Sequence, residues 1–371
     1  MPMVREGTER WRATRPGMLG GMETPAGKSW FRRVVSWLGM GLLVAVIAIA
    51  TVWAGAALHF GNLPWLWARN AMCVLWLIGV PVLFICVRPR KRAFAIFVAA
   101  FAVLVVWWVS IPPRADRAWQ PDVAQMATVK VEGDKLTITG VRNFHYRSET
   151  DFDQKWETRT YDLGKLKSME LSLTYWGSPA IAHSMVSFVF DDPSKPGGID
   201  TLCASIETRK HGTQQYSTVD GFFRQYELIY IFGDERDLIG LRTNHRHEQV
   251  HLYATAMKPD RVRRLLLAYA ARANELAAEP EWYNALTQNC FIGVIELVVG
   301  TASGPVKWAK IIDYRLLLNG YFDEVMYEAR VVDTSMPLEE LRRKTLVNAK
   351  VDGGPIGPDF SAKIREGLPR P

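Results

Sequence analysis

Cys290 is the residue of this sequence whose type and position most directly suggest chemistry. It follows Asn289, and because asparagine is a favoured N-cap, we predict that Cys290 lies in the first turn of a helix over residues 291–299 that ends at Gly300. There, unpaired backbone N–H groups and the positive end of the helix dipole stabilise a thiolate and can hold a developing oxyanion. The alternative interpretation is a structural cysteine on a buried helix, which is the commoner case for a cysteine considered alone.

A thiol nucleophile needs a base, and His183 is the candidate for that role. It begins an apolar run that is predicted to be a strand over residues 183–190, with Met185 and Ser187 on the same face as the imidazole. The end of a strand is a place where a sheet can offer an imidazole to a neighbouring helix terminus. The alternative interpretation is a histidine with a structural role.

The base in turn needs a third group that fixes its tautomer. Glu207 is the candidate because it lies on the next predicted strand, residues 201–208, and consecutive strands often pair. The alternative is an ion pair of Glu207 with Arg209 or Arg242. Rival carboxylates for the same role are Glu227, Glu235 and Asp237.

The other cysteines carry weaker signals. Cys73 and Cys86 fall in apolar segments, where buried thiols are common and inert. A disulfide between Cys203 and Cys290 is an alternative if this part of the chain is exported, but two cysteines make no disulfide framework. We therefore treat Cys290 as a free thiol.

Three histidines form an H-x-H-x3-H pattern that could bind a metal. They are His245, His247 and His251, and on a helix the last two would share a face. No carboxylate-rich set of ligands accompanies them, so solvated or structural histidines are the favoured interpretation. The sequence predicts no metal site and no cofactor.

Three segments, residues 34–58, 71–87 and 93–111, are free of charged side chains, and each is about long enough to cross a bilayer core as a helix. A cleaved signal peptide is the alternative for the first one. Its charged leader is long, however, and two further apolar segments follow. We therefore predict an uncleaved anchor of three transmembrane helices over residues 34–111.

The distribution of Lys and Arg predicts the orientation of this anchor. Lys28, Arg32 and Arg33 precede the first span and residues 88–92 are rich in Arg and Lys, whereas the first loop has only Arg69. The leader and the second loop are therefore predicted to be cytoplasmic. Three crossings then place the rest of the chain in the periplasm, with the anchor in a bacterial inner membrane.

The net charge of +7 is concentrated in the membrane part of the chain. Residues 1–111 carry twelve Lys and Arg and three Glu, a balance of +9, which leaves −2 for the remainder. Because the soluble part has no excess of basic residues, we exclude nucleic acid as a partner.

The soluble part reads as strands first and helices later. A hairpin is predicted within residues 127–139, followed by strands over residues 168–174, 183–190, 201–208 and 225–231. Residues 260–275 have the periodicity of an amphipathic helix. This order predicts an α+β domain. The Gly- and Pro-rich tail after Asn348 is expected to wind over its surface.

An ordered set of motifs in this domain resembles the DUF4105 family, also called the Lnb N-terminal periplasmic domain family. The motifs are Arg142-Asn143-Phe144, Tyr146-Arg147, Ala182-His183, Ser205-Ile206-Glu207-Thr208-Arg209, Gly221-Phe222-Phe223, Tyr226-Glu227-Leu228, Asp234-Glu235-Arg236-Asp237, Pro280-Glu281-Trp282-Tyr283-Asn284 and Leu286-Thr287-Gln288-Asn289-Cys290. The family's hallmarks are one histidine and an Asn-Cys-Thr motif. His183 and Asn289-Cys290 match these hallmarks, but Phe291 replaces the threonine and puts in doubt any role for a hydroxyl beside the thiol.

The resemblance implies a circularly permuted papain-like (NlpC/P60-like) fold, in which the histidine strand precedes the cysteine helix. It also implies lipoprotein N-acylation, the transfer of an acyl chain from a phospholipid to the amine of a lipoprotein's N-terminal cysteine. Cys290 would attack the lipid ester and form a thioester, and His183 would take the thiol proton and later help to deprotonate the amine. Glu207 would orient His183, and Asn289 would support the cysteine.

We therefore predict a cytoplasmic leader (residues 1–33), a three-helix membrane anchor (34–111) and a periplasmic domain (112–371) with a core at about 119–300 and an extension from 301 onward. The predicted function is that of a membrane-anchored Cys–His acyltransferase with phospholipid and lipoprotein as partners. Two alternatives remain open. One is an envelope hydrolase or amidase of the same chemistry, and the other is a non-catalytic scaffold that retains the fold.

Overall fold

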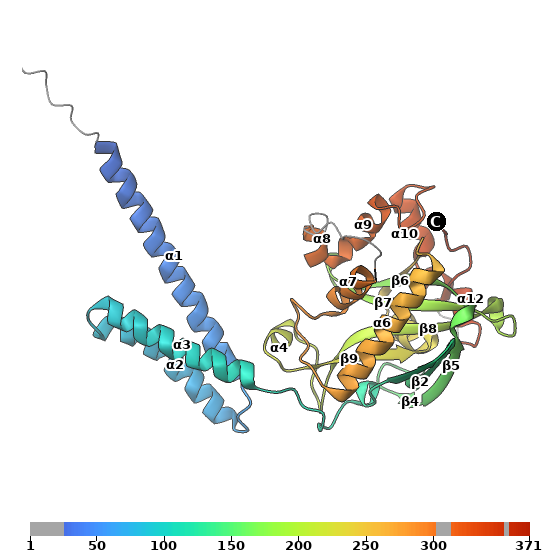
Figure 1. Cartoon of the computed structure of the whole chain (residues 1–371), viewed down its shortest axis with the longest axis horizontal. Coiled ribbons are helices and arrows are strands. Elements are labelled where there is room, and N and C mark those ends of the chain that lie inside the picture. Colours follow the sequence, from blue (N-terminus) through green and yellow to red (C-terminus); the bar gives the residue numbers. More distant parts are fainter. Residues whose placement is uncertain (1–25, 302–312, 352–355) are drawn as a thin grey trace, which may run out of the picture.

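The computed structural model describes residues 26–301, 313–351 and 356–371. Three helices come first, α1 (Ala26–His59), α2 (Leu66–Cys86) and α3 (Arg90–Ser110). All three are long and apolar enough to cross a membrane, as predicted. Figure 1 shows them beside a separate domain, to which α3 leads directly.

The domain is built on an eight-stranded sheet. Seven strands follow one another in the order β1-β2-β9-β8-β7-β6-β10, and β5 pairs with β2 off this path. Their bounds are β1 Thr128–Glu132, β2 Lys135–Arg142, β5 Trp156–Asp162, β6 Leu166–Tyr175, β7 Ala182–Asp191, β8 Ile199–Arg209, β9 Glu227–Gly233 and β10 Gln249–Ala254. The predicted hairpin and the four strands after it are thus confirmed.

Helices cover both faces of this sheet. On one face α6 (Pro259–Ala278) and α7 (Cys290–Gly300) pack through residues such as Leu266, Tyr269 and Val294. The other face is covered by the short helices α5 (Glu235–Gly240), α11 (Asn348–Val351) and α12 (Phe360–Lys363). Because both faces are covered, β7 is buried along nine of its ten residues. The α+β prediction is confirmed.

The C-terminal tail differs from the prediction. Instead of winding over the surface, it contributes Val351, Phe360 and Ile364 to the core on the second face. Its Arg365 is also buried and bonds to Glu235. Apolar residues spaced along a Gly- and Pro-rich stretch can therefore fill a core without forming a long helix.

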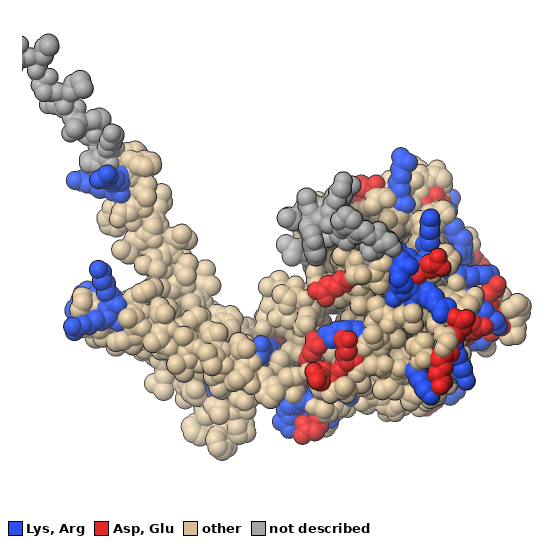
Figure 2. Space-filling model, in the orientation of Figure 1, with Lys and Arg blue, Asp and Glu red and all other residues tan. Residues whose placement is uncertain are grey.

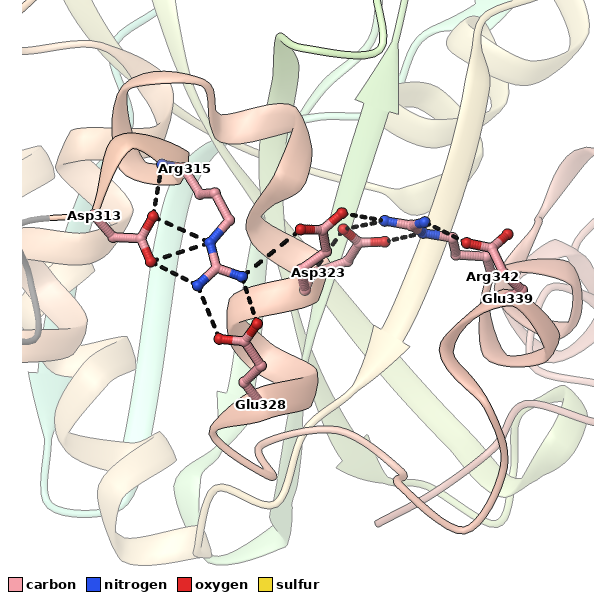
Figure 3. A network of polar contacts seen from close by, with 7 residues as sticks. Asp313, Arg315, Asp323, Glu328, Glu339 and Arg342 are labelled. Atoms are coloured by element: carbon pink, nitrogen blue, oxygen red, sulfur yellow. Dashed lines mark hydrogen bonds and ion pairs between the residues drawn. The ribbon is translucent and has the colours of Figure 1, made fainter.

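Three further helices, α8 (Tyr314–Leu317), α9 (Phe322–Glu328) and α10 (Leu338–Thr345), are joined by ion pairs. Arg315 bridges Asp313 and Glu328, while Arg342 reaches Asp323 and Glu339 (Figure 3). The bonds span three helices because each guanidinium offers several donors in one plane. Asn319, between α8 and α9, connects this group of helices to Ala182 at the start of β7, the strand that carries His183.

Candidate active site

Cys290 is the first residue of α7, as predicted. Asn289 caps the helix: its side-chain oxygen accepts bonds from the N–H groups of Phe291 (3.0 Å) and Ile292 (2.8 Å), and its amide nitrogen donates to the carbonyl of Ala285 (2.9 Å). As the first residue of α7, Cys290 has a backbone N–H that meets no acceptor within the helix. The thiol therefore lies beside a backbone donor that is available to an oxyanion.

A close approach of α7 to the sheet positions the thiol. A Cβ atom on Gly293, one turn after Cys290, would lie 2.6 Å from Ile206 Cδ1 on β8. A larger residue would force the end of the Ile206 side chain to shift, so glycine lets the helix come this near to the strand without rearrangement. Val294 then packs into the core on that face, so the start of α7 points at the ends of β7 and β8.

The two strands separate at this point. The ladder between β7 and β8 ends at Met185↔Ser205, whereas β7 stays paired with β6 as far as Ala182. Ser184 has no partner on β8, and its backbone N–H helps to lower the pKa of the Cys290 thiol. Side chains from both faces of the sheet therefore meet where β7 and β8 separate.

His183 lies at this gap and contacts both other members of the predicted set. Its Nε2 is 3.0 Å from Glu207 Oε1 and 2.9 Å from Ser205 Oγ. The imidazole and the Cys290 thiol shift each other's pKa, so the two groups are near neighbours, and because Nε2 faces Glu207 and Ser205, Nδ1 is the nitrogen that can face the thiol. The structure therefore brings Cys290, His183 and Glu207 together in that order.

Asn319 fixes the backbone next to the base. Its side chain accepts a bond from the N–H of Ala182 (3.0 Å) and donates one to the carbonyl of the same residue (2.7 Å). This pair of bonds replaces a neighbouring strand at the start of β7. Asn319 therefore restricts the position of His183 without touching it.

Both interpretations of Glu207 hold at once, because its carboxylate contacts the base and an arginine. Oε1 accepts bonds from Ser205 Oγ (2.8 Å) and from Arg242 Nη2 (3.2 Å), and Arg242 in turn bonds to Glu248 (2.9 Å). Arg209, the other arginine considered, instead bonds to backbone carbonyls and lies over the ring of Trp119. Arg242 thus keeps the carboxylate in place and ionised.

The electrostatics favour an ion pair between thiol and base. Burial opposes ionisation of Cys290, but His183 and the N–H of Ser184 outweigh it and lower the pKa of the thiol. Burial likewise opposes a charged imidazole, but Glu207, helped by Cys290, raises the pKa of His183 to about 9. Burial is also the largest effect on Glu207, and His183 with Arg242 still holds the pKa of its carboxyl well below its usual range. Each group therefore favours the charged form of the other, a thiolate facing an imidazolium.

Tyr283 is a further neighbour of the thiol that the sequence did not single out. It is buried, and burial, the nearby Cys290 and Tyr216 all raise the pKa of its phenol. A tyrosine that stays protonated keeps its O–H available as a donor. Tyr283 and Asn319 were missed because neither residue type is distinctive and their contacts are far apart in sequence.

The rival groups lie elsewhere. Glu227 pairs with Arg117, Asp237 with Arg142, and Glu235 with Arg365. His247 and His251 do not share a helix face, the arrangement that a metal site on a helix would need, because His247 lies in a loop at φ 54° and His251 on β10. Within the described part of the chain, no group of His, Cys, Asp and Glu is arranged to hold a metal ion, and Cys203 and Cys290 are both free.

A cavity of about 670 Å³ lies next to this site. Its wall includes Glu248, the outermost member of the Glu207–Arg242–Glu248 chain, and also Trp176 from the loop that leads to His183. Asp323 and Arg342 of the ion network in Figure 3 form another part of the wall. The cavity therefore reaches Glu248, at the outer end of the chain of ion pairs that runs from Glu207 through Arg242.

The comparisons with known proteins agree with the resemblance found in the sequence. The model of the Lnb N-terminal periplasmic domain family matches residues 152–320, a range that contains His183, Glu207, Cys290 and Asn319. No curated protein and no solved structure matches the chain. Residues 152–320 are therefore similar to a domain of envelope proteins, while the permuted papain-like fold stays a prediction.

Proposed function

We propose that the chain is a membrane-anchored thiol acyltransferase that acts on lipids or lipoproteins in the cell envelope. Cys290 is the nucleophile, His183 the general acid and base, and Glu207 the group that orients and charges His183. Asn289 supports the start of the cysteine helix. The observation that carries this proposal is the contact of the helix-start thiol with an imidazole that is itself bonded to a carboxylate.

The chemistry proceeds in two half-reactions. The Cys290 thiolate adds to an ester carbonyl, and the Cys290 N–H stabilises the oxyanion. The C–O bond then breaks, the alcohol leaves with the proton of the His183 imidazolium, and a thioester remains. An amine attacks this thioester while His183 takes its proton, so that an amide forms and the free thiol is regenerated.

A membrane location suits a lipid donor, because the enzyme and its substrates are then confined to one surface. In Figure 2 the Lys and Arg side chains near the start of α1 and at the tip between α2 and α3 lie at the ends of the helices away from the domain. This arrangement supports a bacterial inner-membrane anchor with a cytoplasmic N-terminus and a periplasmic domain. Protease added to spheroplasts should digest the domain, whereas protection until lysis would reverse the orientation.

The acyl-enzyme is the species that tests the function. Incubation of the full chain with phospholipid vesicles should add one acyl chain to Cys290, detectable by intact mass and removed by neutral hydroxylamine. Cys290→Ala should abolish the adduct, and Cys203→Ala is the matched control that should keep it. No acylation of the wild-type chain by any ester donor would leave the non-catalytic scaffold as the explanation.

The fate of the thioester separates the transferase from the second candidate, an envelope hydrolase of the same chemistry. With an N-terminal cysteine lipopeptide present, a transferase gives the N-acylated peptide, and a hydrolase gives free fatty acid at the same rate with or without it. Because Lnb is a lipoprotein intramolecular transacylase, a lipopeptide that carries both the ester and the amine should be tested as donor beside a phospholipid.

A further inference from the structure

The domain contacts the outer ends of the membrane helices through the short segment that follows α4 (Thr218–Phe222), and also through Trp282, which donates to the carbonyl of Ile111 (3.1 Å). The ring of Phe223 stacks on Phe60 with centroids 5.1 Å apart and meets Trp108 edge-on at 6.0 Å. Arg224 donates to the carbonyl of Trp108 (2.8 Å), and Gln225 donates to that of Phe60 (2.8 Å). Aromatic and polar contacts together fix this segment to the ends of α1 and α3.

The backbone of Arg224 supports this interpretation. Its φ of 54° lies in the left-handed region, which is unfavourable for a side chain with a Cβ. Such a conformation persists where surrounding contacts over-determine it, and here the contacts are those to the carbonyl ends of α3. The contact between domain and helices is therefore a specific feature of the fold.

This contact lies at the level of the membrane interface. Trp107 and Trp108 end α3, and the exposed Trp65 and Trp67 begin α2 at the same side. Tryptophans at both kinds of helix end are typical of the headgroup layer, which is roughly 5–8 Å thick on each side of the bilayer core. Phe223 touches Trp108, so α4 lies at or in that layer.

Exposed apolar side chains gather on α4 and on the loop before Cys290. Tyr216, Val219 and Leu286 are 48%, 51% and 58% exposed, and we name them the apolar rim. Val219 is one turn before Phe223, to which its carbonyl is hydrogen-bonded. Figure 2 shows that the part of the domain facing the helices, over α4, is largely free of charged side chains. Such a surface is costly in water but suits a lipid layer.

The segments that carry the apolar rim are joined to the cysteine helix by hydrogen bonds. Gly221 of α4 accepts a bond from the N–H of Ala285, and Ala285 accepts one from Asn289, the cap of the cysteine helix. In parallel, Gly221 faces the ring of Tyr283, whose pKa the nearby Cys290 raises. The rim therefore belongs to the same segments that hold the start of the cysteine helix.

We propose that the apolar rim of Tyr216, Val219 and Leu286 dips into the lipid headgroup layer and admits the acyl chains of a membrane lipid to Cys290. This inference rests on the proposed function for its catalytic part and specifies the substrate class as an ester presented by the bilayer surface. The rim also explains why the domain is fixed to its anchor: a rigid contact keeps the entrance at a constant depth.

Photo-crosslinking tests the location of the rim without reference to activity. The full chain carries benzoylphenylalanine at Val219 or, as a matched control, at Val131, a valine of 45% exposure on β1. The hairpin of Val131 contacts the start of α6 through Asp134 and Arg263, away from the α4 side. In phosphatidylglycerol and phosphatidylethanolamine vesicles, irradiation should give at least about tenfold more lipid adduct at Val219 than at Val131. Equal adducts would overturn the proposal.

A second measurement tests the admission of lipid. Val219→Asp should lower the ratio of Cys290 acylation by vesicle phospholipid to acylation by a water-soluble ester about tenfold, the loss expected when an apolar contact of this size is replaced by a charge. Val131→Asp should leave that ratio at the wild-type value. An unchanged ratio in Val219→Asp would contradict a role in lipid entry. If no donor acylates Cys290, the proposed function fails, while the adduct at Val219 still decides whether the rim meets lipid.

Discussion

Two arginines on the same face of the sheet each hold a pair of glutamates. Arg242 bonds to Glu207 (3.2 Å) and Glu248 (2.9 Å) near the ends of β7 and β8. Arg365 bonds to Glu170 (2.8 Å) and Glu235 (2.7 Å) farther along the sheet. Each network also has a cysteine beside it, Cys290 in the first and Cys203 in the second.

The networks differ in access and in the presence of a base. Glu170 and Glu235 are fully buried, whereas a quarter of the Glu207 side chain is exposed. Burial and the nearby Glu235 raise the pKa of Cys203, so that thiol stays neutral. Near Cys290, the imidazole of His183 joins an arginine and its two glutamates, and the pKa of the Cys290 thiol is lowered. Similar ion pairs thus stabilise the fold in one place and charge a nucleophile in the other.

The largest expected effect is the loss of the base that distinguishes the two networks. His183→Gln keeps a polar side chain beside Glu207 but removes the proton carrier, so the rate of Cys290 acylation should fall about 10³-fold. The acylation assay measures this, and Arg365→Lys in the other network should change the rate of the folded enzyme little. A rate within tenfold of wild type in His183→Gln would exclude His183 as the base.

Loss of the arginine should lower the free energy of unfolding more in the second network, that of Arg365, than in the first. Arg365→Met leaves two buried carboxylates without their partner, which is expected to lower the free energy of unfolding by about 3–5 kcal/mol. Urea denaturation, followed by a spectroscopic signal of the domain, measures this loss. Arg147→Met is a control, since its partners Asp151 and Asp153 are exposed and should lose little. A destabilisation of Arg365→Met no larger than that of Arg147→Met would show that this network is not structural.

Glu207→Gln removes a carboxylate from the first network and should change the pH range over which Cys290 is acylated. The Glu207 carboxylate raises the pKa of His183 to about 9, so its removal lowers that pKa. The imidazolium that protonates the leaving alcohol is lost as pH rises through this value, and the alkaline limb of the rate profile should therefore move to lower pH by roughly one unit or more. Acylation rates between pH 5 and 10 measure it, and Glu248→Gln is the milder control. An unmoved alkaline limb would assign it to another group.

The parts of the site that could be predicted are those set by local sequence. Asn289 before an apolar run is a helix cap wherever it occurs, so the position of Cys290 followed from its neighbours. The antiparallel pairing of consecutive strands likewise brought Glu207 near His183. Local patterns of this kind depend on a few residues and are little affected by the rest of the fold.

The remaining contacts could not be predicted because they depend on the path of the whole chain. Asn319 bonds to Ala182 across 137 residues, and nothing in its own neighbourhood marks it as a clamp. Tyr283 meets Cys290 only because the loop between α6 and α7 returns along α4. The tail was misjudged for a related reason, since Phe360 and Ile364 gain their place from a sheet face that no local pattern predicts.

The smallest expected effect concerns Cys203, the counterpart of the nucleophile in the second network. Cys203→Ala removes a neutral sulfur from a core where the residue is fully buried, so the free energy of unfolding should fall by about 1 kcal/mol. The acylation rate should stay at the wild-type value, because this thiol has no charged base beside it. Thermal unfolding and the acylation assay give the two readouts on the same preparation. A loss of acylation in a folded Cys203→Ala chain would contradict the comparison, because it would mean that the buried network, too, takes part in the chemistry.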